Sequence, residues 1–205
     1  MANEIDQVDP PALPLAPDTY NRPFTDQQSN VLRLFFRRLT NVVTTLTATD
    51  VGGKFLYTPC ASFYSTQDQT AGSINTGYAV TFNNTAYNSA VTLSNNSRIN
   101  VQNAGVYKFD VTLQLEHNNS SETPVTVWEQ KNGSAVAYSG HMFDVKGNDD
   151  YVIHWGFTTA LAANDYVEVY WATGDTQLNL HTEAATSPHP GIPSASIDIS
   201  FVSNV

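Results

Sequence analysis

Few residues of this sequence have the types and spacing that catalysis or metal binding requires. Two adjacent carboxylates, Asp149 and Asp150, follow Gly147 and Asn148 in a turn-like segment. Adjacent side chains on a strand point to opposite faces, so this pair gives no evidence of the fixed carboxylate separation that glycoside hydrolysis uses. An oxygen-rich turn also suits calcium, but a solvated hairpin turn is the favoured interpretation.

The histidines, the single cysteine and the tryptophans show no catalytic pattern either. No two histidines have the His-x-His or His-x-x-x-His spacing of zinc sites. Cys60 is expected to be a small buried apolar residue, and each tryptophan falls in an expected strand, where core packing is favoured over stacking on a sugar. We therefore predict a protein that is not an enzyme and holds no metal and no cofactor. The histidines are His117, His141, His154, His181 and His189, and the tryptophans are Trp128, Trp155 and Trp171.

Composition and charge argue against several classes of partner and of cellular location. The sequence has 19 acidic and 9 basic residues, a net charge of −10, which disfavours nucleic acid and anionic membranes as partners. No apolar run approaches the ~18 residues that a membrane span needs. The lone cysteine rules out an intrachain disulfide, and residues 1–4 have neither the basic nor the apolar region of a secretion signal. We therefore expect a protein made in a cytoplasm and not secreted.

Residues 1–24 form a proline-rich segment with five prolines. Proline fixes φ and removes a backbone donor, so the segment is predicted to be an extended arm. A disordered tail is the alternative that composition favours. If the arm lies on another protein, its apolar and aromatic side chains would anchor it, and these are Leu13, Leu15, Tyr20 and Phe24.

We predict a short helix over residues 25–50. Thr25 and Gln28 have the spacing of a capping box, which marks a helix start. Five apolar residues then recur at spacings of three, four, three and four, the a/d pattern of a coiled-coil seam. An amphipathic helix packed on its own domain is the alternative, because a seam of under three heptads is marginal alone. The seam residues are Leu32, Phe35, Leu39, Val42 and Leu46.

Beyond Gly52 and Gly53, an expected hinge, the hydrophobic period changes from 3.6 to 2. From Tyr107 to Glu116, apolar and polar residues alternate over ten positions, which is typical of a strand with one solvated face. About ten such runs follow one another, separated by turn signals such as Asn132-Gly133. This pattern predicts an all-β sandwich or barrel with antiparallel pairing over residues 54–205.

Four separated motifs run through this region: Gly105–Phe109, Trp128–Ser134, Leu161–Val169 and Ile197–Phe201. In order and spacing they resemble the globular heads of complement's first component and the tumour-necrosis-factor-like domains. The resemblance implies a jelly-roll β-sandwich of about ten antiparallel strands that forms a homotrimer with an apolar three-fold axis. A heptad seam just before the domain would lie along the same axis. The collagen-like stalk and secretion signal of the animal members are missing, so their immune roles do not transfer.

The first segment carries a second resemblance. Residues 13–17, Tyr20 and residues 30–36 are similar to N-terminal regions of structural proteins from marine tailed bacteriophages. This resemblance implies a virion structural protein, made in the host cytoplasm and anchored to the particle by its arm and helix. A capsid decoration or cement protein, or a head-attached fibre, would fit this description.

The anchoring hypothesis assigns a role to three clustered arginines. Arg33, Arg37 and Arg38 would meet an acidic patch on the major capsid protein or another virion protein. The alternative is a tail-fibre tip that attaches to the host, in which the loops at 117–123 and 141–150 bind a receptor or a surface glycan.

Overall fold

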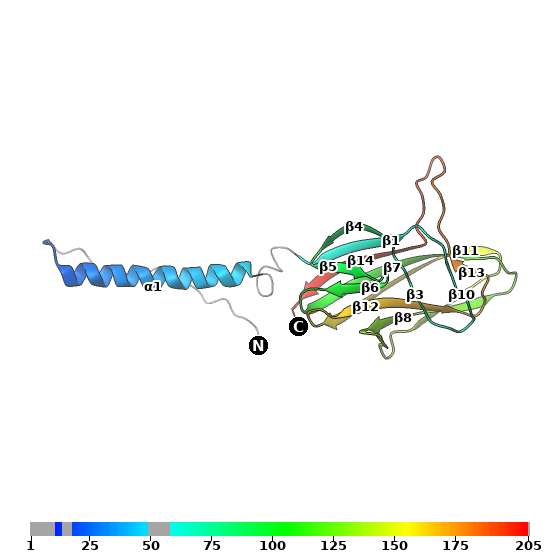
Figure 1. Cartoon of the computed structure of the whole chain (residues 1–205), viewed down its shortest axis with the longest axis horizontal. Coiled ribbons are helices and arrows are strands. Elements are labelled where there is room, and N and C mark those ends of the chain that lie inside the picture. Colours follow the sequence, from blue (N-terminus) through cyan, green and yellow to red (C-terminus); the bar gives the residue numbers. More distant parts are fainter. Residues whose placement is uncertain (1–10, 14–17, 49–57, 205) are drawn as a thin grey trace. The chain divides into compact units, whose positions relative to one another are not determined.

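The computed structural model describes residues 11–13, 18–48 and 58–204. The chain divides into two compact units, Met1–Tyr57 and Thr58–Val205 (Figure 1). Outside the described residues lie the expected hinge at Gly52 and Gly53, most of the proline-rich arm, and Leu15.

The first unit contains the helix α1 (Arg22–Thr47). Asn21 caps it, since its side-chain oxygen accepts a hydrogen bond from the Phe24 N–H at 3.3 Å. Pro23 fits in the first turn because its missing N–H would have no helical partner there. The helix therefore begins before Thr25, and the predicted start at a Thr25 capping box is wrong.

The C-terminal end of α1 is rich in threonine, which lowers helix propensity. The hydroxyl of Thr40 donates back to the Phe36 carbonyl at 2.8 Å, a bond that competes with the helical ladder. α1 ends at Thr47, and Ala48 is already extended, with φ −63° and ψ 126°. Residues 49–50 of the predicted helix lie outside the described residues.

The second unit contains strands in two antiparallel sheets. Sheet 1 has the order β2-β13-β7-β14-β1-β4, with β11 also paired to β7, and sheet 2 has the order β10-β8-β12-β6-β5, with β3 on β12 and β9 on β8. The strands are β1 (Cys60–Ser65), β2 (Gln69–Thr70), β3 (Tyr78–Ala79), β4 (Asn84–Ser89), β5 (Val91–Ser94), β6 (Arg98–Val101), β7 (Gly105–His117), β8 (Thr123–Lys131), β9 (Ser134–Ala135), β10 (His141–Val145), β11 (Asp149–Leu161), β12 (Tyr166–Thr173), β13 (Leu178–Leu180) and β14 (Ala195–Ser203).

Eight of these strands pair in a nested order. Taking β1, β6, β7, β8, β10, β11, β12 and β14 as first to eighth, the first pairs with the eighth and the second with the seventh. The third then pairs with the sixth and the fourth with the fifth. Nested antiparallel pairing across two sheets defines a jelly roll. The predicted fold class is therefore confirmed, and the remaining strands are mostly short additions to the two sheets.

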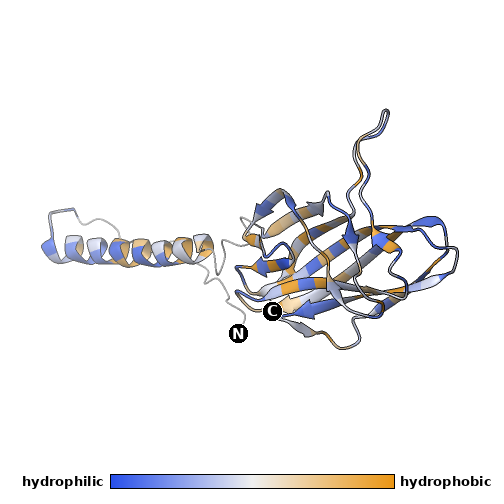
Figure 2. Ribbon diagram, turned by 45° about the vertical axis from the view of Figure 1, so that its right-hand side comes forward, coloured by the Kyte–Doolittle hydropathy of each residue, from blue (hydrophilic) through white to orange (hydrophobic). Residues whose placement is uncertain are grey.

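The core lies between the two sheets. Along β7 the apolar residues of the predicted alternation, from Tyr107 to Leu115, are all fully buried, while their neighbours face outward. Figure 2 shows the same alternation of hydrophobic and hydrophilic residues along many strands. The Asn132-Gly133 turn signal also holds, because both residues have positive φ, 50° and 80°, between β8 and β9.

Candidate functional site

The predicted coiled-coil seam forms an apolar stripe on α1, a helix with no buried residue. Its residues share one face because they are three and four positions apart. Leu39 is 37% exposed, the other four are partly exposed, and Phe36 beside them is 58% exposed. The apolar stripe of an amphipathic helix normally packs against another surface that shields it from water. The stripe, Leu32, Phe35, Leu39, Val42 and Leu46, is therefore a candidate self-association surface, and its role stays a prediction.

The predicted anchoring residues are exposed or partly exposed wherever the structure describes them. Arg33, Arg37 and Arg38 are exposed on α1, and within the described residues none of them has an ion-pair partner. Tyr20 is 84% and Leu13 is 45% exposed, and Phe24 is partly exposed. These side chains are thus available to a partner, but their anchoring role stays a prediction.

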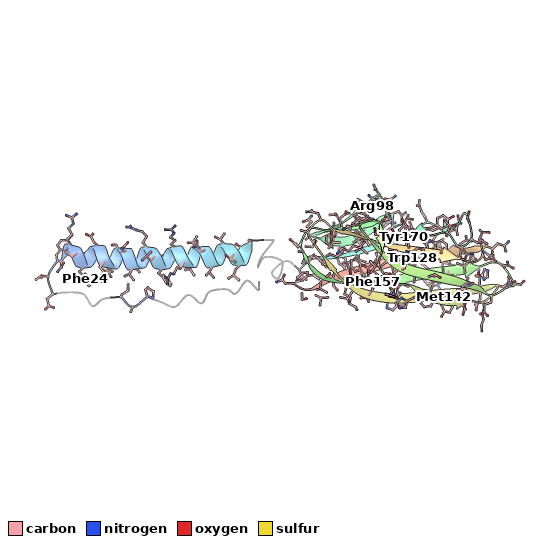
Figure 3. The ribbon with its side chains drawn as sticks, turned by 90° about the horizontal axis from the view of Figure 1, so that it is seen from below. Phe24, Arg98, Trp128, Met142, Phe157 and Tyr170 are labelled. Atoms are coloured by element: carbon pink, nitrogen blue, oxygen red, sulfur yellow. The ribbon has the colours of Figure 1, made fainter. Side chains whose placement is uncertain are left out.

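A second candidate surface lies at the edge of the sandwich formed by β10 and β11, hereafter the β10–β11 edge. Among the described strands, β11 pairs only with β7, over thirteen residues, and β10 pairs only with β8. The two edge strands contact each other. Exposed apolar side chains lie along them: Met142 is 69% exposed (Figure 3), Val152 is 53% exposed and Tyr151 is 42% exposed. A long strand with a free edge presents unpaired N–H and C=O groups to another chain.

Aromatic rings stack beneath this edge. Phe109 and Phe157 stack at 4.9 Å, and Phe157 stacks on Trp155 at 4.6 Å. His141 from β10 lies 5.7 Å from the Trp155 ring and so links the two sheets. The stack is a rigid support for the edge, because aromatic pairs at such distances are attractive beyond the burial of their area.

A buried carboxyl group lies in the same part of the sandwich. Glu129 on β8 points into the core, is 3% exposed, and its Oε1 has no hydrogen-bond partner among the described residues. Burial raises the pKa of Glu129, while the Thr159 hydroxyl on β11 and the charge of Lys131 lower it in part. The carboxyl group therefore contacts the edge strand of sheet 1 through the Thr159 hydroxyl, which favours its ionised form, while its burial disfavours that form.

His117 is a structural histidine. Its side chain is fully buried, with Nδ1 3.1 Å from the Lys146 carbonyl and Nε2 3.3 Å from Asp175 Oδ2. The Gln177 N–H is the main cause of a lowered Asp175 pKa, and contacts with Asn119 and His117 contribute. Both ring nitrogens of His117 are therefore occupied in holding loops together.

Asp149 and Asp150 are exposed at the start of β11, where they pair in register with His117 and Glu116. A polar cavity of about 250 Å³ lies beside them. Within the described residues, no three His, Cys, Asp or Glu side chains are arranged to hold a metal ion. No helix in the described part of the chain is long and apolar enough to cross a membrane.

The other sequence candidates divide between core and surface. Cys60 is partly exposed at the start of β1 rather than buried. Trp155 and Trp171 are buried, as expected of core residues. Trp128 instead lies on the outer face of sheet 2, beside Tyr170 with ring centroids 5.7 Å apart (Figure 3). The expectation of core packing is wrong for Trp128, because only its alternate neighbours on β8 point inward.

Comparisons with known proteins find similarity to solved structures but to no family model. No protein-family model and no curated protein sequence matches this chain. The chain is similar to murine APRIL at pH 5.0, with 10% identity and a TM-score of 0.48, over 70% of this chain and 98% of that one. It is also similar to the globular domain of zebrafish complement 1qA protein, with 14% identity and a TM-score of 0.47, over 72% and 98%. Similarities this low assign no function, and the jelly-roll class rests on the strand pairing.

The sequence did not single out the β10–β11 edge. Val152 and Met142 belong to runs with ordinary strand character, and nothing local distinguishes an edge strand from a central one. Their exposure follows from which strands pair across the sandwich. The one available signal is the run of outward positions after Asp150, which contains no Asp, Glu, Lys or Arg residue in an otherwise acidic domain.

Proposed function

We propose that this chain is a non-enzymatic structural protein of a tailed-bacteriophage particle, a homotrimer anchored by its N-terminal arm and helix. The observation that carries the proposal is the presence of an uncovered apolar surface in each unit: the stripe on α1 and the β10–β11 edge. The jelly roll already has a complete core of its own. Further copies of the same chain would cover both surfaces.

The composition of the α1 stripe favours more than two strands. Leu32, Leu39 and Leu46 occupy a positions, and Phe35 and Val42 occupy d positions. Leucine at a with a β-branched or bulky residue at d shifts coiled coils away from dimers. The seam from Leu32 to Leu46 covers 15 residues, about two heptads, which is marginal for an isolated coiled coil. The jelly rolls would therefore share in holding the trimer together.

Attachment to a particle would use the first unit. Exposed aromatic and apolar side chains on the arm suit grooves of another protein, and the exposed arginines suit an acidic patch on a major capsid protein or another virion protein. The likeness of residues 13–17, Tyr20 and residues 30–36 to phage structural proteins supports this role. Within it, a capsid decoration or cement protein and a head-attached fibre are both compatible with the chain.

Light scattering of the full chain and binding to particles that lack it test the two parts of this proposal. A trimer has a mass of about 67 kDa, three times the 22.4 kDa of one chain. A chain without residues 1–24 is expected to remain trimeric, with a mass lower only by the deleted residues, and to lose particle binding. A full-length Arg37→Glu, Arg38→Glu variant tests the arginines separately, because it keeps the arm and the seam and reverses the charge at two positions; it is expected to remain trimeric and to bind particles more weakly. A monomeric full chain refutes the trimer, and particle binding by the truncated trimer refutes the anchor.

Host attachment through a surface glycan is the second candidate, and Trp128 favours it. Trp128 and Tyr170 form an outward aromatic pair on sheet 2, and Arg98 lies 4.6 Å above the Tyr166 ring nearby. Aromatic faces flanked by polar groups are suited to saccharides. Binding of the trimer to a glycan array, lost in Trp128→Ala and kept in Thr126→Ala on the same face, would support this role. Equal binding by both variants would exclude it.

A further inference from the structure

The connection between β13 and β14 forms a projecting hairpin, residues 182–193, hereafter the finger (Figure 1). Among the described residues, the hydrogen bonds of residues 183–192 stay within the finger: the Glu183 N–H donates to the Ile192 carbonyl at 3.0 Å, and the His189 N–H donates to the Thr186 carbonyl at 2.8 Å. All residues from 184 to 191 are exposed. The orientation of the finger is therefore set by the contacts at its base.

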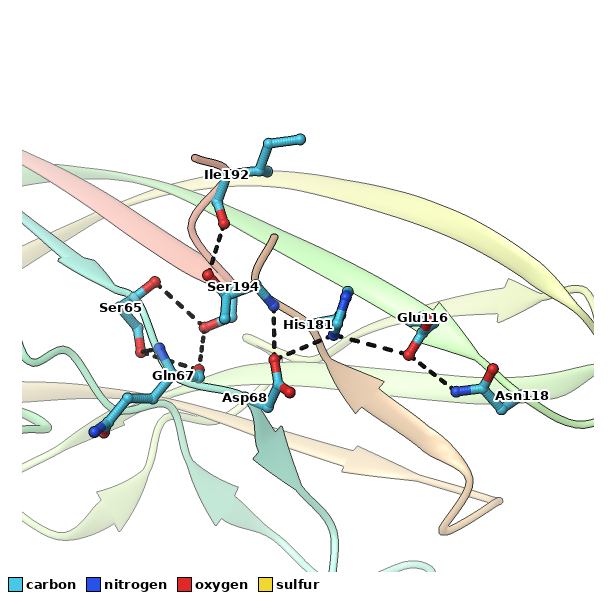
Figure 4. Close-up of polar contacts among 9 residues, drawn as sticks. Ser65, Gln67, Asp68, Glu116, Asn118, His181, Ile192 and Ser194 are labelled. Atoms are coloured by element: carbon cyan, nitrogen blue, oxygen red, sulfur yellow. Dashed lines mark hydrogen bonds and ion pairs between the residues drawn. The ribbon is translucent and has the colours of Figure 1, made fainter. Parts of the chain in front are cut away.

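The C-terminal arm of the finger is held by bonds that do not depend on pH. Ser194 is fully buried, its N–H donates to the Ser65 carbonyl at 3.0 Å, and its hydroxyl donates to the Gln67 carbonyl at 2.6 Å (Figure 4). Neither neutral hydroxyls nor backbone groups titrate in the physiological range. Any pH dependence must therefore enter through the other arm.

The N-terminal arm is held by a carboxylate and a histidine. Asp68 Oδ1 accepts a hydrogen bond from the Thr182 N–H at 2.8 Å and lies 3.1 Å from Nδ1 of His181 (Figure 4). On its other side, His181 Nδ1 lies 3.8 Å from Glu116 Oε2 on β7. Asp150 on β11 is the register partner of Glu116, so it adds a third carboxylate to this end of the sheet.

At these distances, the charge of the His181 imidazole decides whether Asp68 and Glu116 are held together at the base of the finger. Histidine changes its charge between about pH 5 and 8. A cationic His181 is attracted to Asp68 and Glu116 together, whereas a neutral ring leaves the carboxylates to repel each other across it. We propose that His181 is a proton-controlled latch that fixes the base of the finger at acidic pH and loosens it as pH rises. The latch is independent of the phage assignment.

Hydrogen exchange of the full chain tests the latch. Protection factors of the Thr182 and Glu183 amides, which correct for the intrinsic pH dependence of exchange, are expected to be about 2- to 5-fold higher at pH 5.5 than at pH 7.5, as for one half-exposed ion pair. His181→Gln is expected to abolish this difference. His189→Gln is the matched control, because it removes the histidine at the tip of the finger and leaves the base intact.

Two results would overturn the latch: equal protection factors at both pH values in the wild-type chain, or an undiminished difference in His181→Gln. A second measurement does not depend on that variant folding. In the wild-type chain, the NMR shift of the Thr182 amide is expected to follow the titration of the His181 ring, and Glu116→Gln is expected to reduce the amplitude. An amide shift that does not follow the ring also refutes the proposal.

Discussion

Replacing Glu129 by glutamine removes an ionisable group from the core while keeping its size. In the wild-type chain the carboxyl group is 3% exposed and Oε1 has no partner among the described residues, so ionisation leaves a charged oxygen unsatisfied. An unsatisfied buried group costs about 1–3 kcal/mol. Because Thr159 and Lys131 offset part of this cost, we expect a pH-dependent stabilisation of about 1–2 kcal/mol in Glu129→Gln.

The sign of the pH dependence follows from the raised pKa. Below the ordinary carboxyl pKa of 4.5 the group is neutral in both the folded and the unfolded chain, so wild type and variant differ little. As pH rises from there through the higher folded-state pKa, the unfolded wild-type chain ionises first, and the wild-type fold loses stability relative to the variant. The gap in free energy of unfolding is therefore expected to widen from pH 4 and to level off above the folded-state pKa.

Urea denaturation at fixed protein concentration, from pH 4 to pH 8, measures this gap. Each kcal/mol also corresponds to about 2–4 °C in the melting temperature of a chain of this size. Glu122→Gln, which changes an exposed carboxyl group just before β8, is the matched control and is expected to show little pH-dependent gain. A gap that stays constant across the range, or that narrows as pH rises, would refute the account of Glu129 as a buried, poorly compensated acid.

Three further substitutions probe the self-association surfaces and the core. Leu39→Lys in the α1 stripe places like charges together and is expected to lower the mass measured by light scattering from trimer towards monomer. Val152→Lys on β11 is expected to do the same with an unchanged circular dichroism spectrum, and an intact trimer would refute a role for that edge. Gly105→Ala brings a Cβ within 2.8 Å of the Ser203 carbonyl and is expected to destabilise the domain by about 1–3 kcal/mol in urea, whereas Gly140→Ala, whose Cβ would meet only a backbone oxygen at 4.0 Å, is expected to be neutral.

Local sequence patterns predicted much of the fold. The alternation along β7 identified the buried face of the central strand, because strand geometry places every second side chain on the same side. The helix was predicted, but its start was missed because Asn21 and Pro23, not Thr25, make the cap. The helix start could have been predicted if Asn21 followed by Pro23 had been compared with Thr25 as the candidate cap.

Long-range pairing accounts for what the sequence did not reveal. Trp128 and Trp155 both lie in strands of similar character, yet Trp128 lies partly exposed on the outer face of sheet 2 and Trp155 is buried in the core. The contact of His181 with Asp68 joins residues more than a hundred positions apart, at the junction of β2 and β13. No periodicity encodes such contacts, since they depend on which strands become neighbours in the sheets.

The proposed function requires trimer formation and particle binding, and the charges of the chain predict that salt affects these two associations in opposite ways. From residue 51 onward the chain has five basic and thirteen acidic residues, a net charge of −8 per copy, so trimer formation brings like charges together. The outward positions of β11 after Asp150, from Val152 to Ala160, and the seam on α1 carry no Asp, Glu, Lys or Arg residue. Association through these surfaces is therefore opposed by long-range repulsion that salt screens, with a Debye length of about 30 Å at 0.01 M and about 10 Å at 0.1 M.

Particle binding through Arg33, Arg37 and Arg38 has the opposite dependence, because salt screens attraction to an acidic patch. Raising the ionic strength from 0.02 to 0.5 M is expected to tighten the trimer in sedimentation equilibrium and to weaken its binding to particles. The Arg37→Glu, Arg38→Glu variant is expected to keep the first effect and to lose the second. If salt instead dissociated the trimer, ion pairs between copies would hold it together, and the uncharged surfaces identified on α1 and β11 would not be the interface.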